Sequence, residues 1–359
     1  MVLDFAKEAI QNADHNSINF DELKAGKASI KVIGAGGCGC NMVTWLFNKG
    51  ITGATVYATN TDALHLSVTK ADEKILIGKE LTRGLGAGGK PTKGREAAKE
   101  SLVDLKKAVG NADMVFVLAG MGGGTGTGAA PVIAQLAKET GAVVIGVVTM
   151  PFEAEKARID KAEFGLAELR EATDTCIVLD NNRLVDIAGQ LPLEQAFAVA
   201  NELVSTMVKG IVETITLPSL INLDYADVSS IMKNGGVAVI GIGESDAQDR
   251  VSEAVKQALT HPLLDVDYKG ASGALVHITC GPDLKLEEFD AIGRTVSENL
   301  SSDAQVIIGA RIAKDFVGRV RVITIMTGVK SPYVLGKDFE DESMPVSREM
   351  SDLGIDILR

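Results

Sequence analysis

Short, continuous runs of apolar residues alternate along the chain with longer stretches that have helical periodicity. Apolar runs separated by helices predict a parallel β-sheet that is covered on both faces. In the first half of the chain we expect strands at residues 29–33, 55–59, 75–77, 114–119, 143–149 and 176–179. Ligands of such sheets bind beyond the carboxyl ends of the strands, so the loops that follow the strands are the candidate site.

A long amphipathic helix is predicted after these strands. Pro192 suits its first position, apolar residues recur every three or four positions as far as Ile215, and Pro218 follows its end. Beyond it, strands near 237–242, 274–279, 305–312 and 321–327 and helices near 247–260 and 286–300 predict a smaller α/β domain. The expected organisation is an N-terminal helical extension at 1–27, a sheet domain at 28–191, the central helix at 192–217, the smaller domain at 218–329 and a flexible tail at 330–359.

The most unusual segment is the glycine- and threonine-rich stretch from Gly120 to Gly128, which directly follows an apolar run. Each glycine costs about 0.5–1 kcal/mol of backbone entropy relative to alanine, so a packed core has no use for so many. Unblocked N–H groups and two hydroxyls beside a helix that we expect to begin near Ala129 would form a phosphate cradle. The alternative is a flexible hinge, which the strand and helix signals on both sides disfavour.

Loops of similar chemistry follow the neighbouring strands, at 34–41, 60–62, 83–94, 151–158 and 180–183. The spacing Gly34-x-Gly36-x-x-Gly39, with Asp62 further on, also fits a dinucleotide fingerprint. A nicotinamide enzyme would not need the second phosphate loop, and the sequence has no P-loop ending in Gly-Lys-Ser/Thr. A triphosphate held mainly by backbone N–H groups is the better fit.

A second constellation, Asn222-x-Asp224-x-x-Asp227, lies past the end of the predicted long helix. Asn201 lies near the start of that helix. At a rise of 1.5 Å per residue, the two acids lie roughly 35 Å from Asn201. The two acids therefore cannot reach a nucleotide bound by their own chain. They are either part of a capped, solvated turn or a group that positions water at a neighbour's nucleotide. The second reading requires a head-to-tail contact, which makes a filament when its rotation does not close.

Composition narrows the class of protein further. The net charge of −12 argues against nucleic acid as a partner and against unaided binding to an anionic membrane. No apolar run reaches the roughly 18 residues of a membrane-spanning helix, so direct membrane insertion is not expected. Four scattered cysteines indicate a reduced, cytoplasmic setting. Cys38 and Cys40 have no histidines at metal-ligand spacing, so we interpret them as small residues in a glycine loop.

The stretch 122–128, the loop 36–41, the sequence Gly86-Ala87-Gly88-Gly89 and the Asn222-x-Asp224-x-x-Asp227 cluster together resemble the FtsZ family, the prokaryotic homologues of tubulin. The resemblance covers about residues 29–329, and several features resemble the archaeal members. It implies an α/β fold with a tubulin-like, Rossmann-type parallel-sheet GTPase domain, a long central helix and a smaller α/β C-terminal domain. It also implies a cytoplasmic GTPase that polymerises head to tail and scaffolds the division ring at mid-cell, at the inner face of the membrane.

The resemblance also assigns roles to residues of this chain. The residues that would bind GTP or GDP are Gly36, Gly37, Cys38, Gly39, Cys40, Asn41, Ala87, Gly88, Gly89, Gly122, Gly123, Gly124, Thr125, Gly126, Thr127, Gly128, Glu155, Arg158, Asn181, Phe197, Asn201 and Glu202. Within this set Phe197 would stack on guanine, although a core position in an amphipathic helix is the alternative. Either Glu153 or Glu155 would contact the ribose, and we prefer Glu155.

The catalytic residues implied by the resemblance are Asp224, Asp227 and Asn222, which would enter the next subunit's pocket and orient the attacking water. Mg²⁺ would accompany the phosphates without a metal-ligand set of the protein's own, and K⁺ or Na⁺ is left open as a further ion. A variant of this reading is a nucleotide-binding cytoskeletal paralogue with weak or no hydrolysis.

Some positions depart from the family pattern. Cys38 and Cys40 stand where the family has smaller or amide side chains, Glu202 stands where it has Asp, and Ser219 replaces Gly. The terminal residues 355–359 resemble the family's peptide that docks onto a membrane-anchor protein, and a frayed terminus is the alternative.

Overall fold

The computed structural model describes residues 28–217, 219–221, 223–233, 236–260, 271–298 and 300–329. The expected N-terminal extension, the tail with its partner-binding peptide, and Asn222 lie outside these residues.

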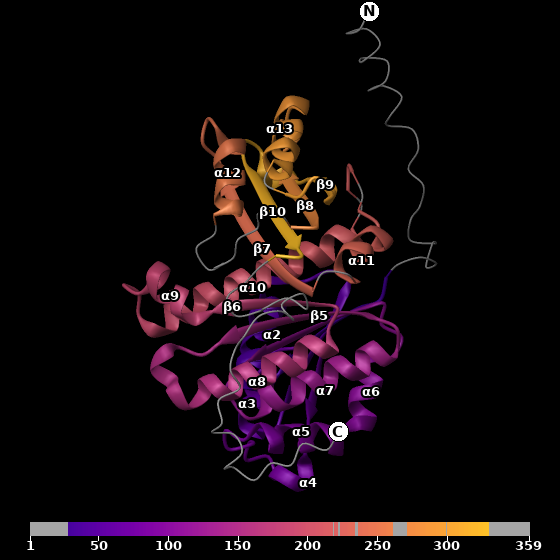
Figure 1. Ribbon diagram of the computed structural model, residues 1–359, viewed down its shortest axis with the longest axis vertical. Helices are drawn as coiled ribbons and strands as arrows, with labels where there is room; N and C mark the ends of the chain where they lie inside the picture. Colours follow the sequence, from indigo (N-terminus) through magenta and orange to yellow (C-terminus); the bar gives the residue numbers. More distant parts are fainter. Residues whose placement is uncertain are drawn as a thin grey trace, which may run out of the picture.

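One continuous sheet of ten described strands runs through the molecule, in the order β3-β2-β1-β4-β5-β6-β7-β10-β8-β9 (Figure 1). The strands are β1 (Ile30–Ala35), β2 (Ala54–Asn60), β3 (Glu73–Leu76), β4 (Met114–Gly120), β5 (Val143–Met150), β6 (Thr175–Asp180), β7 (Gly236–Ser245), β8 (Gly273–Cys280), β9 (Gln305–Ile312) and β10 (Val320–Thr327). Neighbours from β3 to β7 are parallel, β10 is antiparallel to both β7 and β8, and β8 is parallel to β9. The predicted α/β fold with a mostly parallel sheet is confirmed, and every expected strand overlaps an observed one.

The C-terminal strands continue the first sheet rather than starting a second one. Three residues of β6, Thr175 to Ile177, pair in parallel with the beginning of β7. The strands of the two halves of the chain therefore form one hydrogen-bonded layer.

Helices cover both faces of this sheet. The described helices are α2 (Gly36–Lys49), α3 (Ala63–Val68), α4 (Lys79–Thr82), α5 (Pro91–Glu100), α6 (Leu102–Val109), α7 (Thr125–Glu139), α8 (Lys156–Ala172), α9 (Asn181–Ala188), α10 (Leu193–Thr216), α11 (Tyr225–Lys233), α12 (Arg250–Leu259) and α13 (Leu286–Ser297), with 3₁₀ turns η2 (Glu153–Glu155) and η3 (Lys314–Phe316). One core contains side chains of α5 to α8, α12 and α13, and the other contains side chains of α2, α3, α10 and α11. Alternate residues of β4 enter the two cores, as Val117 and Leu118 do, because successive side chains of a strand point to opposite faces.

Helix α7 begins earlier than the sequence pattern predicts, at Thr125 rather than near Ala129. A Cβ atom at Gly126 would lie 2.8 Å from the carbonyl oxygen of Gly120 and 3.1 Å from that of Ala35. Gly126 thus lets the first turn of the helix approach the strand ends closely, so part of the glycine-rich stretch is helix rather than loop.

Helix α10 begins at Leu193, and Pro192 is the residue before its first turn rather than its first helical residue. Its buried side chains include Val204, Val208 and Ile211, which contribute to the core shared with α2. Figure 1 shows α9 beside one end of α10 and α11 beside the other, so α10 connects two distant parts of the molecule.

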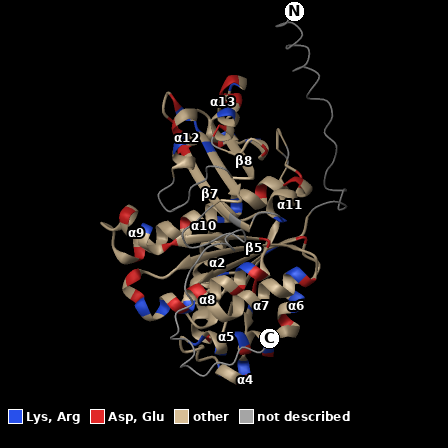
Figure 2. Cartoon of the chain, in the orientation of Figure 1, with Lys and Arg blue, Asp and Glu red and all other residues tan. Residues whose placement is uncertain are grey.

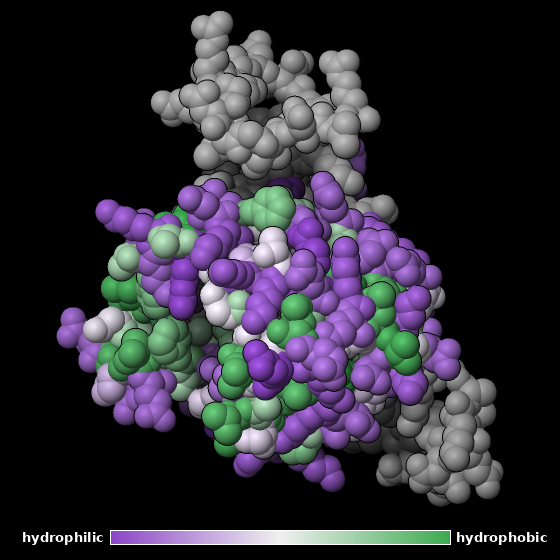
Figure 3. Space-filling model, turned by 90° about the horizontal axis from the view of Figure 1, so that it is seen from below, coloured by the Kyte–Doolittle hydropathy of each residue, from purple (hydrophilic) through white to green (hydrophobic). Residues whose placement is uncertain are grey.

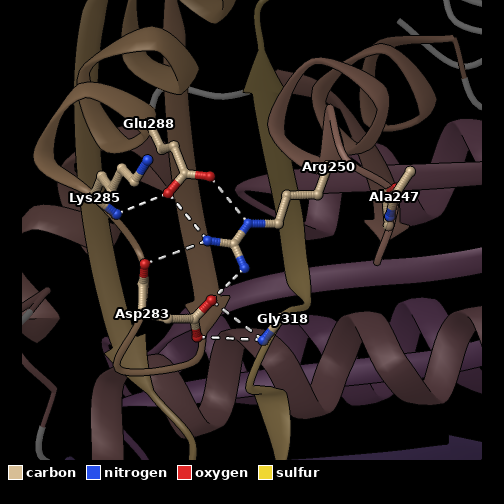
Figure 4. Close-up of polar contacts among 7 residues, drawn as sticks. Ala247, Arg250, Asp283, Lys285, Glu288 and Gly318 are labelled. Atoms are coloured by element: carbon tan, nitrogen blue, oxygen red, sulfur yellow. Dashed lines mark hydrogen bonds and ion pairs between the residues drawn. The ribbon is translucent and has the colours of Figure 1, made fainter.

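Arg250 at the start of α12 ties three C-terminal segments together (Figure 4). Its guanidinium donates from Nε to Glu288 Oε1 at 3.0 Å and from Nη1 to Asp283 Oδ2 at 2.5 Å. Asp283 also accepts from the backbone N–H of Gly318 at 3.2 Å. The pKa values of the Asp283 and Glu288 carboxyl groups are lowered below their ordinary values, mainly by the hydrogen bonds from Arg250.

The exterior is polar. Lysine, arginine, aspartate and glutamate are interspersed on the outer helices and are fewer on the strands (Figure 2). The face seen in Figure 3 is mostly hydrophilic, with apolar side chains between the polar ones. Among the described residues, no helix combines the length and apolar character that a membrane span requires.

Candidate nucleotide-binding site

A cavity of about 400 Å³ lies at the carboxyl ends of β1, β4 and β5, where the parallel topology places a ligand site. This volume falls in the range of small-molecule sites. The lining residues are Ala35, Gly37, Cys38, Asn41, Gly120, Met121, Gly123, Gly124, Thr125, Gly126, Thr149, Pro151, Phe152, Glu155, Arg158, Asn181, Phe197 and Asn201. Twelve of the residues expected at the nucleotide are thereby brought together from loops that lie far apart in the sequence.

The N-termini of α2 and α7 both face this cavity, since Gly37 and Thr125 belong to their first turns. Free N–H groups and the helix dipole favour an anion at such ends. At Gly37 and Gly123 a Cβ atom would have no protein atom within 4 Å, although both residues line the cavity. Protein packing does not require glycine at these two positions, and the space that a side chain would occupy is left open for a ligand.

The two threonines of the predicted cradle differ in their surroundings. Thr125 lines the cavity, and its Oγ1 lies 2.6 Å from Oγ1 of Thr61. Thr127 is almost fully buried, and its methyl group lies where a side chain at Gly165 of α8 would be. Its Oγ1 has no hydrogen-bond partner among the described residues. Thr127 therefore packs α7 against α8 and does not line the cavity.

The two cysteines that were predicted in the first loop, Cys38 and Cys40, also differ in their surroundings. Cys38 lines the cavity with its Sγ 3.5 Å from Oγ1 of Thr149, and burial raises the pKa of its thiol more than that hydrogen bond lowers it. Cys40 lies on the buried face of α2, donates to the carbonyl oxygen of Thr59 at 3.7 Å, and has a pKa raised by burial to about 12. Both thiols are neutral at pH 7, and of the two only Cys38 reaches the ligand space.

Aromatic and amide side chains also line the cavity. The rings of Phe152 and Phe197 meet edge to face, with centroids 6.0 Å apart and planes at 66°. Phe197 is 38% exposed, so it is a wall of the cavity rather than a core side chain. Asn181 and Asn201 line the same cavity, and an amide offers both a donor and an acceptor to a planar base.

Glu155, and not Glu153, lines the cavity. Its Oε1 accepts from Nη1 of Arg158 at 2.6 Å, and its Oε2 accepts from the backbone N–H of Phe152 at 3.2 Å. These two bonds fix the carboxylate within the set of residues that contains the aromatic side chains.

Several predicted residues do not line the cavity. Glu202 forms an ion pair with Lys49, the last residue of α2, and is not among the residues that line the cavity. Ala87 and Gly89 lie behind Gly124. A Cβ atom added to Gly124 would be 2.8 Å from Cβ of Ala87 and 3.2 Å from N of Gly89. The remaining predicted residues outside the lining are Gly36, Gly39, Cys40, Gly88, Gly122, Thr127 and Gly128.

The lining also contains six residues that the sequence analysis did not single out individually: Ala35, Gly120, Met121, Thr149, Pro151 and Phe152. All of them except Thr149 lie in the candidate stretches 34–41, 120–128 and 151–158. Most of them end a parallel strand or directly follow one. That position is itself the signal by which they could have been found.

The predicted catalytic acids lie elsewhere. Asp224 is exposed and precedes α11, and its Oδ1 accepts from the backbone N–H of Asp227 at 2.8 Å. Neither acid lines the cavity, and α11 lies at the end of α10 opposite to α9 (Figure 1). The rise of α10 from Asn201 to Thr216 alone is about 22 Å. One chain therefore does not bring the acids to its own cavity.

The sheet order, the cavity between two helix N-termini and the long helix leading away from it define a parallel-sheet α/β protein with a site suited to an anionic ligand. Residues 29–189 match the Tubulin/FtsZ family, GTPase domain, and residues 236–330 match the FtsZ family, C-terminal domain. The chain belongs to the FtsZ family and is a GTPase of cell division.

Relatives extend this result over nearly the full chain. Cell division protein FtsZ 2 of Halobacterium salinarum is 51% identical over 356 residues, which are 98% of this chain and 90% of the relative. Cell division protein FtsZ 2 of Methanocaldococcus jannaschii is also 51% identical, with 98% of this chain and 93% of the relative covered. The solved FtsZ dimer of M. jannaschii superimposes with a TM-score of 0.80 at 46% identity and covers 95% of this chain and 98% of that one.

Proposed function

We propose that this GTPase polymerises head to tail and that its active site is completed between two subunits. One subunit binds GTP in the cavity, and the next subunit contributes Asp224 and Asp227. The observation that carries the proposal is the placement of the cavity and the two acids toward opposite ends of α10. A relative forms a dimer in its solved structure, which supports self-association of this chain.

A guanine nucleotide is proposed to occupy the cavity in one orientation. The phosphates would lie at the N-termini of α2 and α7, over the open positions at Gly37 and Gly123. The base would lie at the aromatic and amide side chains, stacked on Phe197 and hydrogen-bonded by the amides of Asn181 and Asn201. Glu155 would accept hydrogen bonds from the ribose hydroxyls, between the phosphates and the base.

The acids act on the water that attacks the terminal phosphorus atom. Water forms the new P–O bond as the bond to the leaving GDP breaks, and the carboxylates orient it for in-line attack. One oxygen of Asp224 is engaged by the N–H of Asp227, so its other oxygen is available to the water. Fixed negative groups and helix N-termini that need no reorganisation during the reaction are an effective source of catalysis.

Mg²⁺ would enter with the phosphates. Within the described parts of the chain, no cluster of three or more His, Cys, Asp or Glu side chains offers a metal site. Phosphate oxygens and water are the ligands that Mg²⁺ prefers in nucleotide sites, and the ion neutralises phosphate charge there. Of the two threonine hydroxyls in the cradle, that of Thr125 belongs to a residue that lines the cavity. A monovalent ion, K⁺ or Na⁺, is proposed to accompany Mg²⁺.

In the cell, the filaments would scaffold the division ring at mid-cell, on the cytoplasmic side of the membrane. The terminal residues 355–359, outside the described part of the chain, are proposed to dock onto a membrane-anchor protein. Deleting 353–359 should abolish capture of that partner and leave GTP turnover unchanged.

The test of the shared active site is Asp227→Ala. We expect GTP binding to persist, because Asp227 does not line the binding cavity. Turnover should fall by about 100-fold, because the carboxylate that orients the attacking water is lost. Asp104→Ala, an exposed acid on α6, is the matched control and should turn over GTP at the normal rate. If Asp227→Ala binds and hydrolyses GTP like the unmodified protein, the trans-acting mechanism is wrong.

A further inference from the structure

The segment between α10 and α11 is held on the edge strand β9. The backbone N–H of Ile221 donates to the carbonyl of Ala310 at 3.1 Å, and the N–H of Ala310 donates to the carbonyl of Ile221 at 3.2 Å. These two bonds form an antiparallel bridge at the outer edge of the sheet. Ile221, three residues before Asp224, is thus fixed to the C-terminal strands.

Leu223 adds a side-chain attachment to this bridge. It is 3% exposed, whereas Leu220, three residues earlier, is 71% exposed. Its side chain lies over Gly309 of β9, where an added Cβ would be 2.5 Å from Cγ and 2.7 Å from Cδ1 of Leu223. Glycine within a strand commonly marks such a close approach. Gly309 therefore provides the recess that holds Leu223 next to Asp224.

Tyr225 attaches the other side of Asp224 to the N-terminal part of the sheet. Its hydroxyl donates to the carbonyl oxygen of Asp113, just before β4, at 2.7 Å. Its ring packs against the core that α10 and α11 share. Asp224 is consequently exposed between two anchored neighbours, one on β9 and one beside β4.

We propose that Leu223 and Gly309 are positioning residues for GTP hydrolysis, and that their contact fixes the place of Asp224 and Asp227 on the surface offered to the next subunit. This inference rests on the proposed function, in which those two acids act on the neighbour's nucleotide. Neither Leu223 nor Gly309 touches the nucleotide cavity. Displacement of a catalytic group by about 1 Å is enough to lower a rate by up to 100-fold.

The test compares Gly309→Ala, Leu223→Ala and the double variant. The new methyl group of Gly309→Ala displaces Leu223 by a clash, so turnover per polymerised subunit should fall about 30-fold or more at saturating GTP, further than in Leu223→Ala. GTP affinity of the unpolymerised protein should stay unchanged, because the cavity is remote. Removing the Leu223 side chain as well makes room for the methyl group, and the double variant should regain at least about threefold over Gly309→Ala.

The matched control is Gly293→Ala. A Cβ there would lie 2.8 Å from Cδ1 of Ile308, so it perturbs the same strand β9 from helix α13. It should turn over GTP at the normal rate. Should Gly309→Ala fail to fold, Leu223→Ala alone decides, since it loosens the same attachment without a clash and should lower turnover per polymerised subunit about tenfold.

The inference is overturned if Gly309→Ala hydrolyses GTP normally, if the double variant is no faster than Gly309→Ala, or if Leu223→Ala has normal turnover. Asp227→Ala measured in parallel keeps the two proposals apart. Loss of turnover in Asp227→Ala with normal turnover in Gly309→Ala refutes only the positioning role. Normal turnover in Asp227→Ala refutes the proposed function itself.

Discussion

Oδ1 of Asp224 accepts a hydrogen bond from the backbone N–H of Asp227, at 2.8 Å, where the chain enters α11. Asp224 therefore caps this helix as well as presenting a carboxylate to solvent. The capped-turn interpretation and the catalytic interpretation of the cluster are compatible, because the cap uses one oxygen and leaves the other free. A substitution that retains the cap but removes the charge separates the two roles.

Asp224→Asn is that substitution. Asparagine caps helices about as well as aspartate, so the unfolding free energy should change by less than about 1 kcal/mol. GTP turnover should fall by about 100-fold, because the negative charge that orients water is lost. Asp249→Asn, at the residue before α12, is the control and should change neither quantity. Turnover is measured by phosphate release. Normal turnover in Asp224→Asn would show that the negative charge of Asp224 is not needed for GTP hydrolysis.

Phe197→Ala should weaken binding of guanine nucleotide. The ring forms a wall of the cavity against Phe152, and loss of base stacking costs roughly 1–3 kcal/mol, or about 5- to 150-fold in Kd. Phe164→Ala, which removes an exposed ring on α8, should leave the affinity unchanged. Titration of the unpolymerised protein with a fluorescent GDP analogue measures both, and equal affinities would place the base elsewhere.

Arg250→Leu should destabilise the C-terminal part of the sheet at neutral pH. It removes the shared partner of Asp283 and Glu288, and we expect the thermal midpoint to fall by roughly 2–8 °C. Arg294→Leu, which breaks an exposed pair on α13 with Asp290, should have little effect.

The effect of Arg250→Leu should depend on pH in one direction. Both carboxyl groups have a pKa lowered in the folded state, so their stabilisation is present above the ordinary carboxyl pKa and is lost as pH falls through the lowered values. The difference in midpoint between Arg250→Leu and the unmodified protein should therefore shrink below about pH 4. A difference that grows in acid would contradict this account of the network.

His277 in β8 should contribute a separate loss of stability in mild acid. Burial, and secondarily the charge of Arg311, lower its pKa to about 4, and the side chain is 4% exposed. An unfolded histidine titrates near 6.5, so the folded state loses stability as pH falls from about 6.5 towards 4. Between pH 7 and pH 5 this residue should account for roughly 2 kcal/mol of the loss. Urea unfolding of His277→Leu at both values should show a correspondingly smaller change; an unchanged pH dependence would refute the assignment.

Much of the fold and part of the site follow from local patterns. Apolar runs mark the strands, and the rule that ligands lie beyond parallel strands brings Gly37, Gly123 and Thr125 to one cavity. The start of α7 at Thr125 was missed because Gly126 has a packing role that composition does not reveal. Since helical residues are 100° apart, this early start also turns Thr127 away from the cavity.

Contacts between distant segments account for the other differences. Glu202 pairs with Lys49, far away in the sequence, and no spacing rule on α10 reports such a partner. The recess at Gly309 for Leu223 likewise depends on the register of an edge strand with a connecting loop. The pairing of β6 with β7 is of the same kind, since it joins segments on either side of α10.

The central claim, that two subunits form each active site, is tested most directly by GTP turnover per molecule across a wide range of protein concentration with Mg²⁺ present. We predict negligible turnover at low concentration and a rise above a threshold, because Asp224 and Asp227 reach a nucleotide only in a neighbouring subunit. A rate that is the same at every concentration would show that each chain hydrolyses GTP alone and would contradict the account.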